Sequence, residues 1–551
     1  DSSIDHYSLR VIAIGSTFGM LSNESGDDYY VTSDVSQTIQ ITQSPTPIMS
    51  YETYDFTKND GTVEQRFAGR IHWNFANSTQ TSNINFYKVF VKASNPQNSV
   101  LFGYDISEAQ VDPNYPDYNF YIVRDRRFAN VTYIDTYEFF VIACQDENGF
   151  DSAPSSSLAD LSYNLFASGQ NGSTIPFQIT TELHFSAMKY NLDASYVLTK
   201  NMTLTSVPES IGTTDMPFFG TFDGAGYTIS GTNGALVINS RNTTFKGLFG
   251  VIGEGGIVKN VTFNATINAT TGRTENLIQI AAIAITNNGR IEDVVVQGTV
   301  SSEYNLEAAK VYNAGVAVYN YGTITRVASK AIINPKNTRN DVYAGGISIF
   351  NYGTIEKSGF VGQAYGQVVG GITAQNLGGK IEQCYYEENA ALSTAIITSN
   401  KGLSINMAGG IAGYMTSGSI SYCYSTARVS GSTNTIPVYI GGMVGYISGG
   451  KIQKSYVVAV NPSGASIITA TGSTLNATKA GVFVGVSDST TPVSGSGLIC
   501  RRASGQAFIG SGTFSAQEVA SIQSSLDNAD LNDHGYFDTS TTNPSLRNAK
   551  Y

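Results

Sequence analysis

The sequence predicts an all-β protein in which a solenoid of stacked parallel strands follows a smaller module of β-strands. Three observations support this prediction. The chain of 551 residues contains 56 Gly, 33 Tyr and 27 Phe, a composition typical of strands joined by tight turns. One strand-like segment near the N-terminus recurs at a spacing of 130 residues. A glycine-led unit recurs along the second half of the chain.

Composition excludes several classes of protein. With 41% hydrophobic and 14% charged residues, the chain is too apolar to be disordered. Its formal charge of −11 and its lack of basic clusters argue against nucleic-acid binding. It has no apolar run long enough to span a membrane, and its four cysteines do not form a disulfide framework. Because the chain opens at Asp1 without a signal peptide, we expect a processed piece of a secreted protein.

The N-terminal part carries the first repeat. Residues 4–13 match residues 134–143 at six of ten positions. Tyr137 and Phe139 begin an alternation that is typical of a half-buried strand, and further strands are expected around Trp73 and at 87–91.

A core Trp73, a strand led by Tyr137 and a turn from Gly149 to Ser152 resemble a fibronectin type III module. The resemblance covers residues 46–160 and implies a β-sandwich. Residues 1–38 then correspond to the last strands of a partial copy, which cannot bury its apolar face alone. We expect that the missing strands were removed; donation of strands by another subunit is the alternative.

The second repeat predicts the solenoid. Its units begin at Gly247, Ala281, Ala314, Gly345, Gly370, Gly409, Gly441 and, in a degenerate form, Ala480. An Ile follows each of the first seven starts by ten or eleven residues: Ile257, Ile291, Ile324, Ile355, Ile381, Ile420 and Ile452. Unit starts lie 25 to 40 residues apart, so the rung is constant and one loop varies in length.

The segment from Phe222 to Gly231 and the unit from Gly409 to Tyr414 resemble the GLUG-motif family. That resemblance implies a right-handed parallel β-helix over residues 166–510, in an extracellular and often adhesive protein. Residues 166–240 are then a cap and the first rungs, and residues 241–510 are the repeats.

Two sets of repeat positions predict contacts between rungs. Asn287, Asn320, Asn351 and Asn376 each precede a Gly by two residues, which suggests left-handed corners with stacked amides. Three residues after the last six repeat isoleucines stand small side chains that are expected to point inward: Val294, Val327, Ser358, Cys384, Cys423 and Ser455. We expect Cys384 and Cys423 to be buried thiols; a disulfide is the alternative.

Both ends of a solenoid require a cover. A short helix at 180–190 is expected to cover the first rung. Ser515 and Glu518 form a capping-box pattern with Phe514 and Val519 as a hydrophobic staple, so residues 511–551 are interpreted as a capping helix and tail.

Motifs for catalysis or metal binding are weak. His6, His72, His184 and His534 have no metal-ligand spacing, and the segment from Asp530 to Gly535 is interpreted as a turn and not a calcium loop. Glu292, Glu356 and Glu382 are expected on one solvated face, which we favour over a catalytic pair. We therefore predict no catalytic residue, no cofactor and no metal.

Two candidate surfaces remain. Tyr385, Tyr424 and Tyr456 share one repeat position and form either a strip for glycan or protein contact or a structural stack. Sequons predict N-glycosylation at Asn23, Asn77, Asn130, Asn171, Asn201, Asn242, Asn260, Asn264, Asn268 and Asn476. In the segment 260–269 the apolar side chains take one face, so Asn260, Asn264 and Asn268 are expected on the face open to water.

The sequence thus predicts a non-enzymatic, extracellular structural or adhesive glycoprotein of the cell surface, such as a filament, appendage or coat subunit. Its expected partners are copies of itself, other surface proteins or glycans. The alternative is a carbohydrate-active β-helix protein that binds or cleaves glycans.

Overall fold

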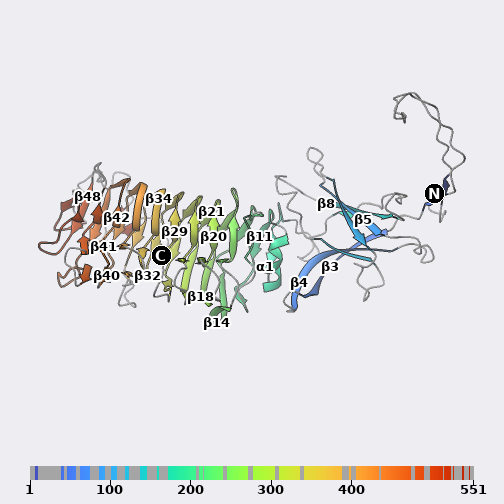
Figure 1. The fold of residues 1–551 in the computed structure, drawn as a ribbon, viewed down its shortest axis with the longest axis horizontal. Helices are drawn as coiled ribbons and strands as arrows, with labels where there is room; N and C mark the ends of the chain where they lie inside the picture. Colours follow the sequence, from blue (N-terminus) through green and yellow to red (C-terminus); the bar gives the residue numbers. More distant parts are fainter. Residues whose placement is uncertain are drawn as a thin grey trace, which may run out of the picture. The chain divides into compact units, whose positions relative to one another are not determined.

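Figure 1 shows the protein as a computed structural model, which divides into two units, Asp1–Gly169 and Gln170–Tyr551. The structure describes the strands of the first unit by their backbone and most of residues 172–525 in full. Within 172–525 it leaves out residues 191, 206–209, 215, 240–244, 271–276, 304–309, 336–340, 388–395, 399–404, 434–435, 473–477, 489–496, 513, 515 and 523–524. Beyond residue 525 it describes β51 (Phe537–Asp538) and β52 (Ser545–Leu546), which pair antiparallel.

The described strands of the first unit form antiparallel sheets. One sheet has the order β3 (Thr46–Thr57), β4 (Val63–Asn74), β7 (Tyr118–Ile122), and another has the order β6 (Leu101–Ser107), β5 (Phe86–Ala93), β8 (Tyr137–Cys144), β9 (Leu158–Ala159). The strands expected at Trp73, at 87–91 and from Tyr137 are present. In the expected partial module, β1 (Tyr7–Leu9) pairs with β2 (Ile39–Ile41), and the other residues of 1–38 lie outside the described part.

The second unit is a parallel β-helix with three sheets along its column (Figure 1). In a typical rung, a strand of the third sheet bends into two strands of the first sheet, and a corner then leads into the second sheet. Every β-ladder within these three sheets is parallel. The predicted solenoid is confirmed.

The first sheet contains β10 (Phe177–Ile179), β11 (Ser195–Leu198), β13 (Thr221–Asp223), β16 (Phe249–Ile252), β17 (Ile257–Lys259), β20 (Ala284–Asn287), β21 (Arg290–Glu292), β24 (Ala317–Asn320), β25 (Thr323–Thr325), β29 (Ser348–Asn351), β30 (Thr354–Glu356), β34 (Thr373–Glu382), β38 (Ala412–Ser421), β42 (Val444–Ile447), β43 (Lys451–Gln453), β47 (Val484–Ser487) and β49 (Ile509–Ser511). The second sheet contains β12 (Met202–Leu204), β14 (Thr228–Asn239), β18 (Thr262–Thr270), β22 (Val295–Glu303), β26 (Ala328–Ser329), β27 (Ile332–Ile333), β31 (Gly359–Phe360), β32 (Gln363–Gly366), β35 (Tyr385–Tyr386), β36 (Ile396–Thr398), β39 (Tyr424–Ser425), β40 (Val429–Thr433), β44 (Ser455–Val458), β45 (Ile468–Gly472), β48 (Leu498–Arg501) and β50 (Gln517–Glu518). The third sheet contains β15 (Phe245–Lys246), β19 (Leu277–Ala281), β23 (Lys310–Ala314), β28 (Val342–Gly345), β33 (Val368–Gly370), β37 (Asn406–Gly409), β41 (Val438–Gly441) and β46 (Thr478–Gly481).

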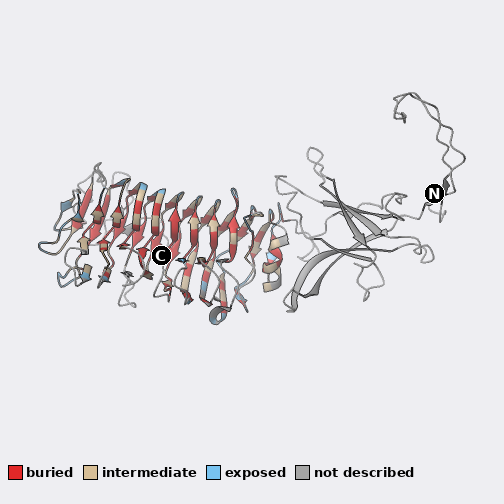
Figure 2. Cartoon of the chain, viewed as in Figure 1, coloured by how far each residue is buried: buried red, intermediate tan, exposed pale blue. Residues whose placement is uncertain are grey.

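The core is a set of aliphatic ladders along the column, and most residues of its strands are buried or intermediate in exposure (Figure 2). Ile291 stacks on Ile324, and both are fully buried. The repeat isoleucines are confirmed as core, with one correction. Val258, and not Ile257, pairs with Ile291 and is buried, because the first unit is longer by one residue before this strand. Each such burial contributes about 1.5–3 kcal/mol.

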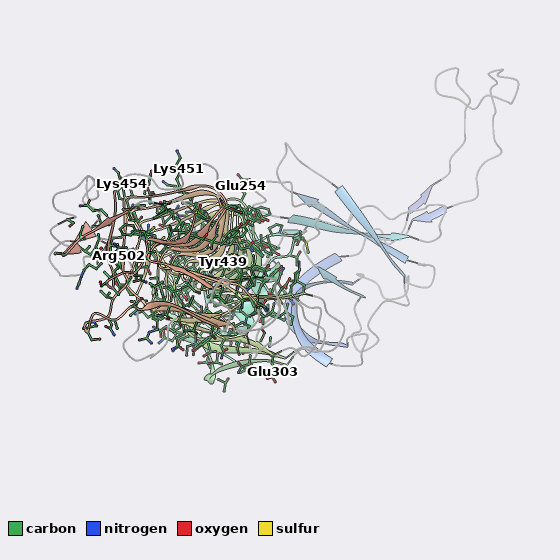
Figure 3. All side chains as sticks on the ribbon, turned by 60° about the vertical axis from the view of Figure 1, so that its left-hand side comes forward. Glu254, Glu303, Tyr439, Lys451, Lys454 and Arg502 are labelled. Atoms are coloured by element: carbon green, nitrogen blue, oxygen red, sulfur yellow. The ribbon has the colours of Figure 1, made fainter. Side chains whose placement is uncertain are left out.

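Charged side chains lie on the outside of the column. Glu254, Lys451 and Lys454 lie on one side of the view in Figure 3, and Glu303 lies on the opposite side. The aliphatic ladders therefore remain free of charge, as a narrow core with a low dielectric constant requires.

Asparagine side chains form a hydrogen-bonded ladder inside the first sheet. Asn287 donates through Nδ2 to Oδ1 of Asn320 at 2.8 Å, Asn320 to Asn351 at 2.9 Å, and Asn351 to Asn376 at 2.8 Å. All four are fully buried. The predicted amide stacking between rungs is confirmed.

The expected left-handed conformation at these asparagines is wrong, because the four residues lie in extended strands. The following glycines serve a different purpose in most rungs: a Cβ on Gly322 would lie 2.1 Å from the carbonyl oxygen of Gly289 in the preceding rung. The turn needs glycine because successive rungs approach closely there.

Left-handed residues instead occupy the corner between the first and second sheets. They have φ angles of 46 to 55° and are Asn260, Asp293, Arg326, Lys357, Gln383, Tyr422 and Lys454. A non-glycine residue in this region costs about 1–2 kcal/mol. Part of the cost is offset by a hydrogen bond to the next rung, as where the N–H of Arg326 donates to the carbonyl of Glu356 at 3.2 Å.

The paired glycines form the tight bend between the third and first sheets. A Cβ on Gly346 would lie 2.1 Å from the carbonyl oxygen of Gly371 and 2.4 Å from Cγ of Phe360. Ala282 occupies the equivalent place in an earlier rung and is fully buried. The bend therefore excludes a side chain in the later rungs but accommodates a methyl group near the start.

A short helix lies at the N-terminal end, as predicted. α1 (Glu182–Ala187) begins after Thr181, whose hydroxyl accepts from the N–H of His184 at 3.2 Å, and a 3-10 turn (Met188–Tyr190) follows. Phe185 is fully buried and packs edge-on against Phe222 at 5.7 Å. The helix thus covers the apolar interior of the first rungs.

The capping box predicted at the other end is wrong. Gln517 and Glu518 form strand β50, which pairs with Ile499 and Cys500, so the expected helix start adds to the second sheet. Helical conformation is found only farther on, at the described residues Ile522 and Ser525. The C-terminal end of the column is nevertheless covered. Ile522 is fully buried in an apolar cluster at the end of the column, with Val519 packed against it.

Candidate functional site

The tyrosines predicted as a contact strip lie inside the column. Tyr385, Tyr424 and Tyr456 are at most 1% exposed. Their rings stack along the column, with centroids 5.5 Å apart for the first pair and 5.0 Å for the second. The proposed role in glycan or protein contact is wrong for these residues, because the second sheet turns this position inward, and the structural stack is the correct alternative.

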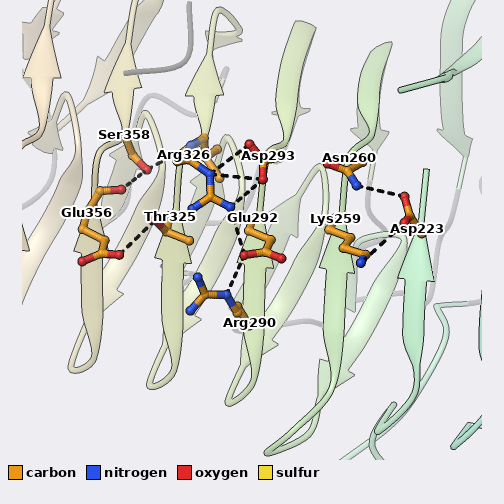
Figure 4. A network of polar contacts seen from close by, with 11 residues as sticks. Asp223, Lys259, Asn260, Arg290, Glu292, Asp293, Thr325, Arg326, Glu356 and Ser358 are labelled. Carbon is orange, nitrogen blue, oxygen red and sulfur yellow. Dashed lines mark hydrogen bonds and ion pairs between the residues drawn. The ribbon is translucent and has the colours of Figure 1, made fainter. Parts of the chain in front are cut away.

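The predicted carboxylate face is a row of polar and ion-paired side chains (Figure 4). Arg326 contacts Asp293 at 2.6 Å and Glu292 at 3.1 Å, and Glu292 also pairs with Arg290 at 2.7 Å. These contacts hold the pKa of Arg326 above its ordinary value, chiefly through its hydrogen bond to Asp293.

Farther along the same face, Glu356 accepts a hydrogen bond from the hydroxyl of Thr325 at 3.0 Å. Glu382 pairs with Lys380 at 2.7 Å. Glu292, Glu356 and Glu382 thus lie on one face, as expected, and each is engaged with a neighbouring side chain, an arrangement that stabilises successive rungs.

Among the residues that the structure describes, no three or more His, Cys, Asp and Glu side chains gather as a metal site would require. His184 lies in α1, where its Nδ1 is 2.9 Å from the hydroxyl of Thr180. Partial burial lowers the pKa of His184. His6 and His534, and the turn from Asp530 to Gly535, lie outside the described residues, and His72 is described by its backbone alone.

The inward small positions are confirmed: Val294, Val327, Ser358, Cys384, Cys423 and Ser455 are fully buried. Cys384 and Cys423 are free thiols in adjacent rungs, and the N–H of Cys384 donates to Sγ of Cys423 at 3.3 Å. Burial raises the pKa of Cys384 well above its ordinary value, with a smaller contribution from Cys423. The thiol of Cys384 is therefore kept protonated and unreactive.

Four of the predicted glycosylation sites are described. Asn264 and Asn201 are exposed, whereas Asn260 and Asn268 are half-buried. Asn260 donates to Asp223 at 3.1 Å, and Asn268 contacts the hydroxyl of Ser301. Asn264 is thus the most accessible of these three sites, and Asn260 lies in the left-handed corner before strand β18 and not on the strand face where it was expected. The sites that lie outside the described residues are Asn23, Asn77, Asn130, Asn171, Asn242 and Asn476.

Another aromatic surface lies on the outside of the column, and we call it the tyrosine strip. Its exposed members are Tyr321 and Tyr352, which lie beside the half-buried rings of Tyr319 and Tyr343. Tyr312 and Phe350 form its buried base, at 7% and 9% exposed. The bend between the third and first sheets folds the outward side chains on either side of it toward each other. Tyr312 from the third sheet consequently meets Phe350 from the first sheet edge-on, at 5.0 Å.

The strip is most exposed at the turn that follows the asparagine ladder. Tyr321 is 51% exposed and Tyr352 is 42% exposed, and their rings stack at 4.8 Å with an angle of 7°. Next to them Tyr319 stacks on Phe350 at 5.1 Å and accepts a hydrogen bond from Nε2 of Gln279 at 2.9 Å. Rings at this spacing follow the repeat distance of the strands.

Burial raises the pKa of several phenols in the strip. The pKa of Tyr343 rises to about 12, with a smaller contribution from the carboxylate of Asp341. The pKa values of Tyr312, Tyr319 and Tyr352 are also raised, in each case mainly by burial. These hydroxyls therefore remain neutral hydrogen-bond donors at physiological pH.

The sequence contained a signal for the strip that was missed. Asn-Tyr-Gly recurs at 320–322 and 351–353, which places Tyr321 and Tyr352 at one repeat position. The asparagine and glycine of this triplet indicate the buried ladder and the close approach of the rungs, whereas the tyrosine between them faces water.

The fold and these ladders define the second unit as a parallel β-helix of solenoid type. No family model matches the chain. A protein described as "Putative Gly-rich membrane protein" from Evansella cellulosilytica is 29% identical over 150 residues, which are 26% of this chain and 17% of that protein. A solved structure titled "IgA1 Protease" aligns with a TM-score of 0.30 and 14% identity, covering 76% of this chain and 29% of that one. The chain thus spans less than a third of either protein.

No helix in the described part of the chain is both long and apolar enough to cross a membrane.

Proposed function

We propose that this protein is a non-enzymatic, extracellular glycoprotein of the cell surface with a structural and adhesive role. The observation that carries the proposal is the combination of a column stabilised by buried ladders with an exposed pair of stacked tyrosines, Tyr321 and Tyr352, on its flank. Exposed aromatic side chains held on a rigid scaffold are typical of interaction surfaces. The expected partners are glycans, other surface proteins or further copies of the chain.

Observations in both units of the chain, Asp1–Gly169 and Gln170–Tyr551, support this proposal. The orders β3-β4-β7 and β6-β5-β8-β9 support a fibronectin type III-like sandwich as a spacer. The glycine-led rungs support a GLUG-like β-helix, and the strong preference of parallel crossovers for one hand supports right-handed winding. Exposed sequons at Asn201 and Asn264 support a glycosylated surface.

The test is immunogold electron microscopy of intact cells that produce the protein, combined with mass spectrometry of the native protein. We expect gold label at the cell surface and N-glycan on Asn264. Label confined to the cell interior, together with unmodified asparagine at all ten sequons, would contradict the proposal. Long regular fibres in the same images would identify a filament subunit, whereas discrete particles would favour a coat or adhesin.

The non-enzymatic part has its own test. Purified protein incubated with plant, fungal and bacterial polysaccharides is expected to release no new reducing ends. Catalysed release that is lost in Glu292→Gln or Glu356→Gln would instead establish the carbohydrate-cleaving alternative.

A further inference from the structure

We propose that the tyrosine strip binds an uncharged glycan chain that runs along the rungs of the β-helix. The inference rests on the proposed adhesive function and names the class of ligand and its site. Four features of the strip carry it: its periodicity, its free hydroxyl groups, its charge and the pairing of its strands.

The first feature is periodicity. The strip repeats Tyr312 as Tyr343, Tyr319 as Phe350 and Tyr321 as Tyr352 in the next rung. A surface that repeats with the strand spacing fits a ligand that also repeats, such as a polysaccharide, better than a compact metabolite.

The second feature is the supply of free hydroxyl groups beside aromatic carbon. Within the described residues, the hydroxyls of Tyr321, Tyr343 and Tyr352 have no protein hydrogen-bond partner. A sugar ring presents C–H groups on its faces and hydroxyl groups at its rim. Tyrosine offers a matching apolar ring and a polar tip.

The third feature is charge. Among the residues that the structure describes, the charged group that acts on the strip is Asp341, whose carboxylate contributes to the raised pKa values of Tyr312 and Tyr343. Lys310 acts on Asp341 in turn. These two described groups are of opposite sign, so together they give the strip little net attraction to an anionic or a cationic ligand. An uncharged ligand suits it best.

The fourth feature is strand pairing, which argues against a peptide ligand. β23 pairs with β19 and β28, and β24 pairs with β20 and β29. β28 and β29 likewise have a neighbour on each side. The backbone edges that an added peptide strand would need are therefore occupied at this site.

The test uses the full chain and isothermal titration with neutral hexasaccharides of glucose, xylose and N-acetylglucosamine, with a heparin hexasaccharide as the charged comparison. We expect at least one neutral probe to bind, with an affinity that changes little with added salt. The double variant Tyr321→Ala/Tyr352→Ala should weaken that affinity roughly tenfold or more.

Tyr227→Ala is the matched control, since Tyr227 is a tyrosine of 37% exposure away from the strip, and it should bind as the unaltered protein does. Tyr352→Phe keeps the ring stack and removes one hydroxyl, so a smaller loss is expected. Circular dichroism of each variant verifies the fold.

Three results would overturn the inference: no binding of any neutral probe, binding of heparin alone, or equal loss in the control variant. Each leaves the proposed function intact when gold label still lies at the cell surface. Conversely, glycan binding through the strip by a protein located inside the cell would overturn the proposed function and leave the inference standing.

Discussion

Asn320 donates a hydrogen bond to Oδ1 of Asn351 at 2.9 Å while accepting one from Nδ2 of Asn287 at 2.8 Å. It also donates to the carbonyl of Thr354 at 3.3 Å. One buried amide thus joins three successive rungs. In a low-dielectric interior this chain of amides is stabilising only while every member keeps its partners.

Asn320→Ala should therefore lower the free energy of unfolding by about 2–3 kcal/mol, because Oδ1 of Asn351 and one donor of Asn287 lose their partner in the core. The measurement is the urea midpoint followed by circular dichroism. Asn288→Ala, at an exposed turn position of the rung before, is the control and should change stability by less than about 0.5 kcal/mol. Equal effects of the two variants would show that the ladder contributes no stability.

Gly346→Ala should destabilise the column by about 2–3 kcal/mol, because the added methyl group meets the carbonyl of Gly371 in a bend that cannot expand. The reverse change at the equivalent place, Ala282→Gly, should cost only about 1 kcal/mol. Thermal unfolding of both variants makes the comparison. A Gly346→Ala protein as stable as the unaltered one would contradict the close approach of the rungs.

Stability should fall in alkaline solution partly through Tyr343. Burial raises the pKa of Tyr343 from 10.0 to about 12, so the unfolded chain loses this proton first as the pH rises. The contribution of Tyr343 is complete below the unfolded pKa and is lost as the pH rises through the folded one. Urea midpoints between about pH 9 and about pH 12 should decline less steeply for Tyr343→Phe. Identical slopes in the two proteins would refute this assignment.

The ion pair of Asp293 and Arg326 should contribute modestly and in a salt-dependent way. A double-mutant cycle with Asp293→Asn and Arg326→Gln is expected to give a coupling energy of about 0.5–1 kcal/mol, since both side chains are partly exposed. The coupling should shrink on addition of 1 M salt, about the concentration that reduces the Debye length to 3 Å. A coupling energy that salt leaves unchanged would indicate that the two side chains interact through packing and not through their charges.

Tyr424 should matter for stability and not for ligand binding. Tyr424→Ala removes a fully buried ring from a stack and should cost about 3–5 kcal/mol. Tyr227→Ala should be nearly neutral. Any glycan affinity through the tyrosine strip should persist in the folded fraction of Tyr424→Ala; its selective loss would restore Tyr424 as a contact residue.

Patterns with a fixed spacing were predictable from the sequence. The repeat isoleucines, the stacked amides from Asn287 to Asn376 and the small inward positions at Val294 and Cys384 follow from strand periodicity and residue size. The helix near Glu182 was expected because the open end of a solenoid requires a cover. These features depend on neighbours in the chain or on equivalent positions in the next rung, which a repeating sequence displays directly.

Features that depend on the direction in which a side chain points were not predictable from the sequence. Tyr385 and Tyr321 both stand at regular repeat positions, yet one is buried and the other is 51% exposed. The segment from Ser515 to Glu518 matches a capping box, but pairing with Ile499 and Cys500 places Gln517 and Glu518 in a sheet. Tertiary pairing here outweighs a local helix signal.

The amino-acid sequence alone determined that this chain repeats, that its repeats stack as parallel strands, and which aliphatic side chains fill the column. Only the tertiary structure decided which tyrosines face water, which residues adopt the left-handed corner and how the last rung is covered. The physical reason is that periodicity sets which side chains are neighbours, whereas the angle of each bend, set by the close approach of backbones such as those at Gly346 and Gly371, determines which way they point.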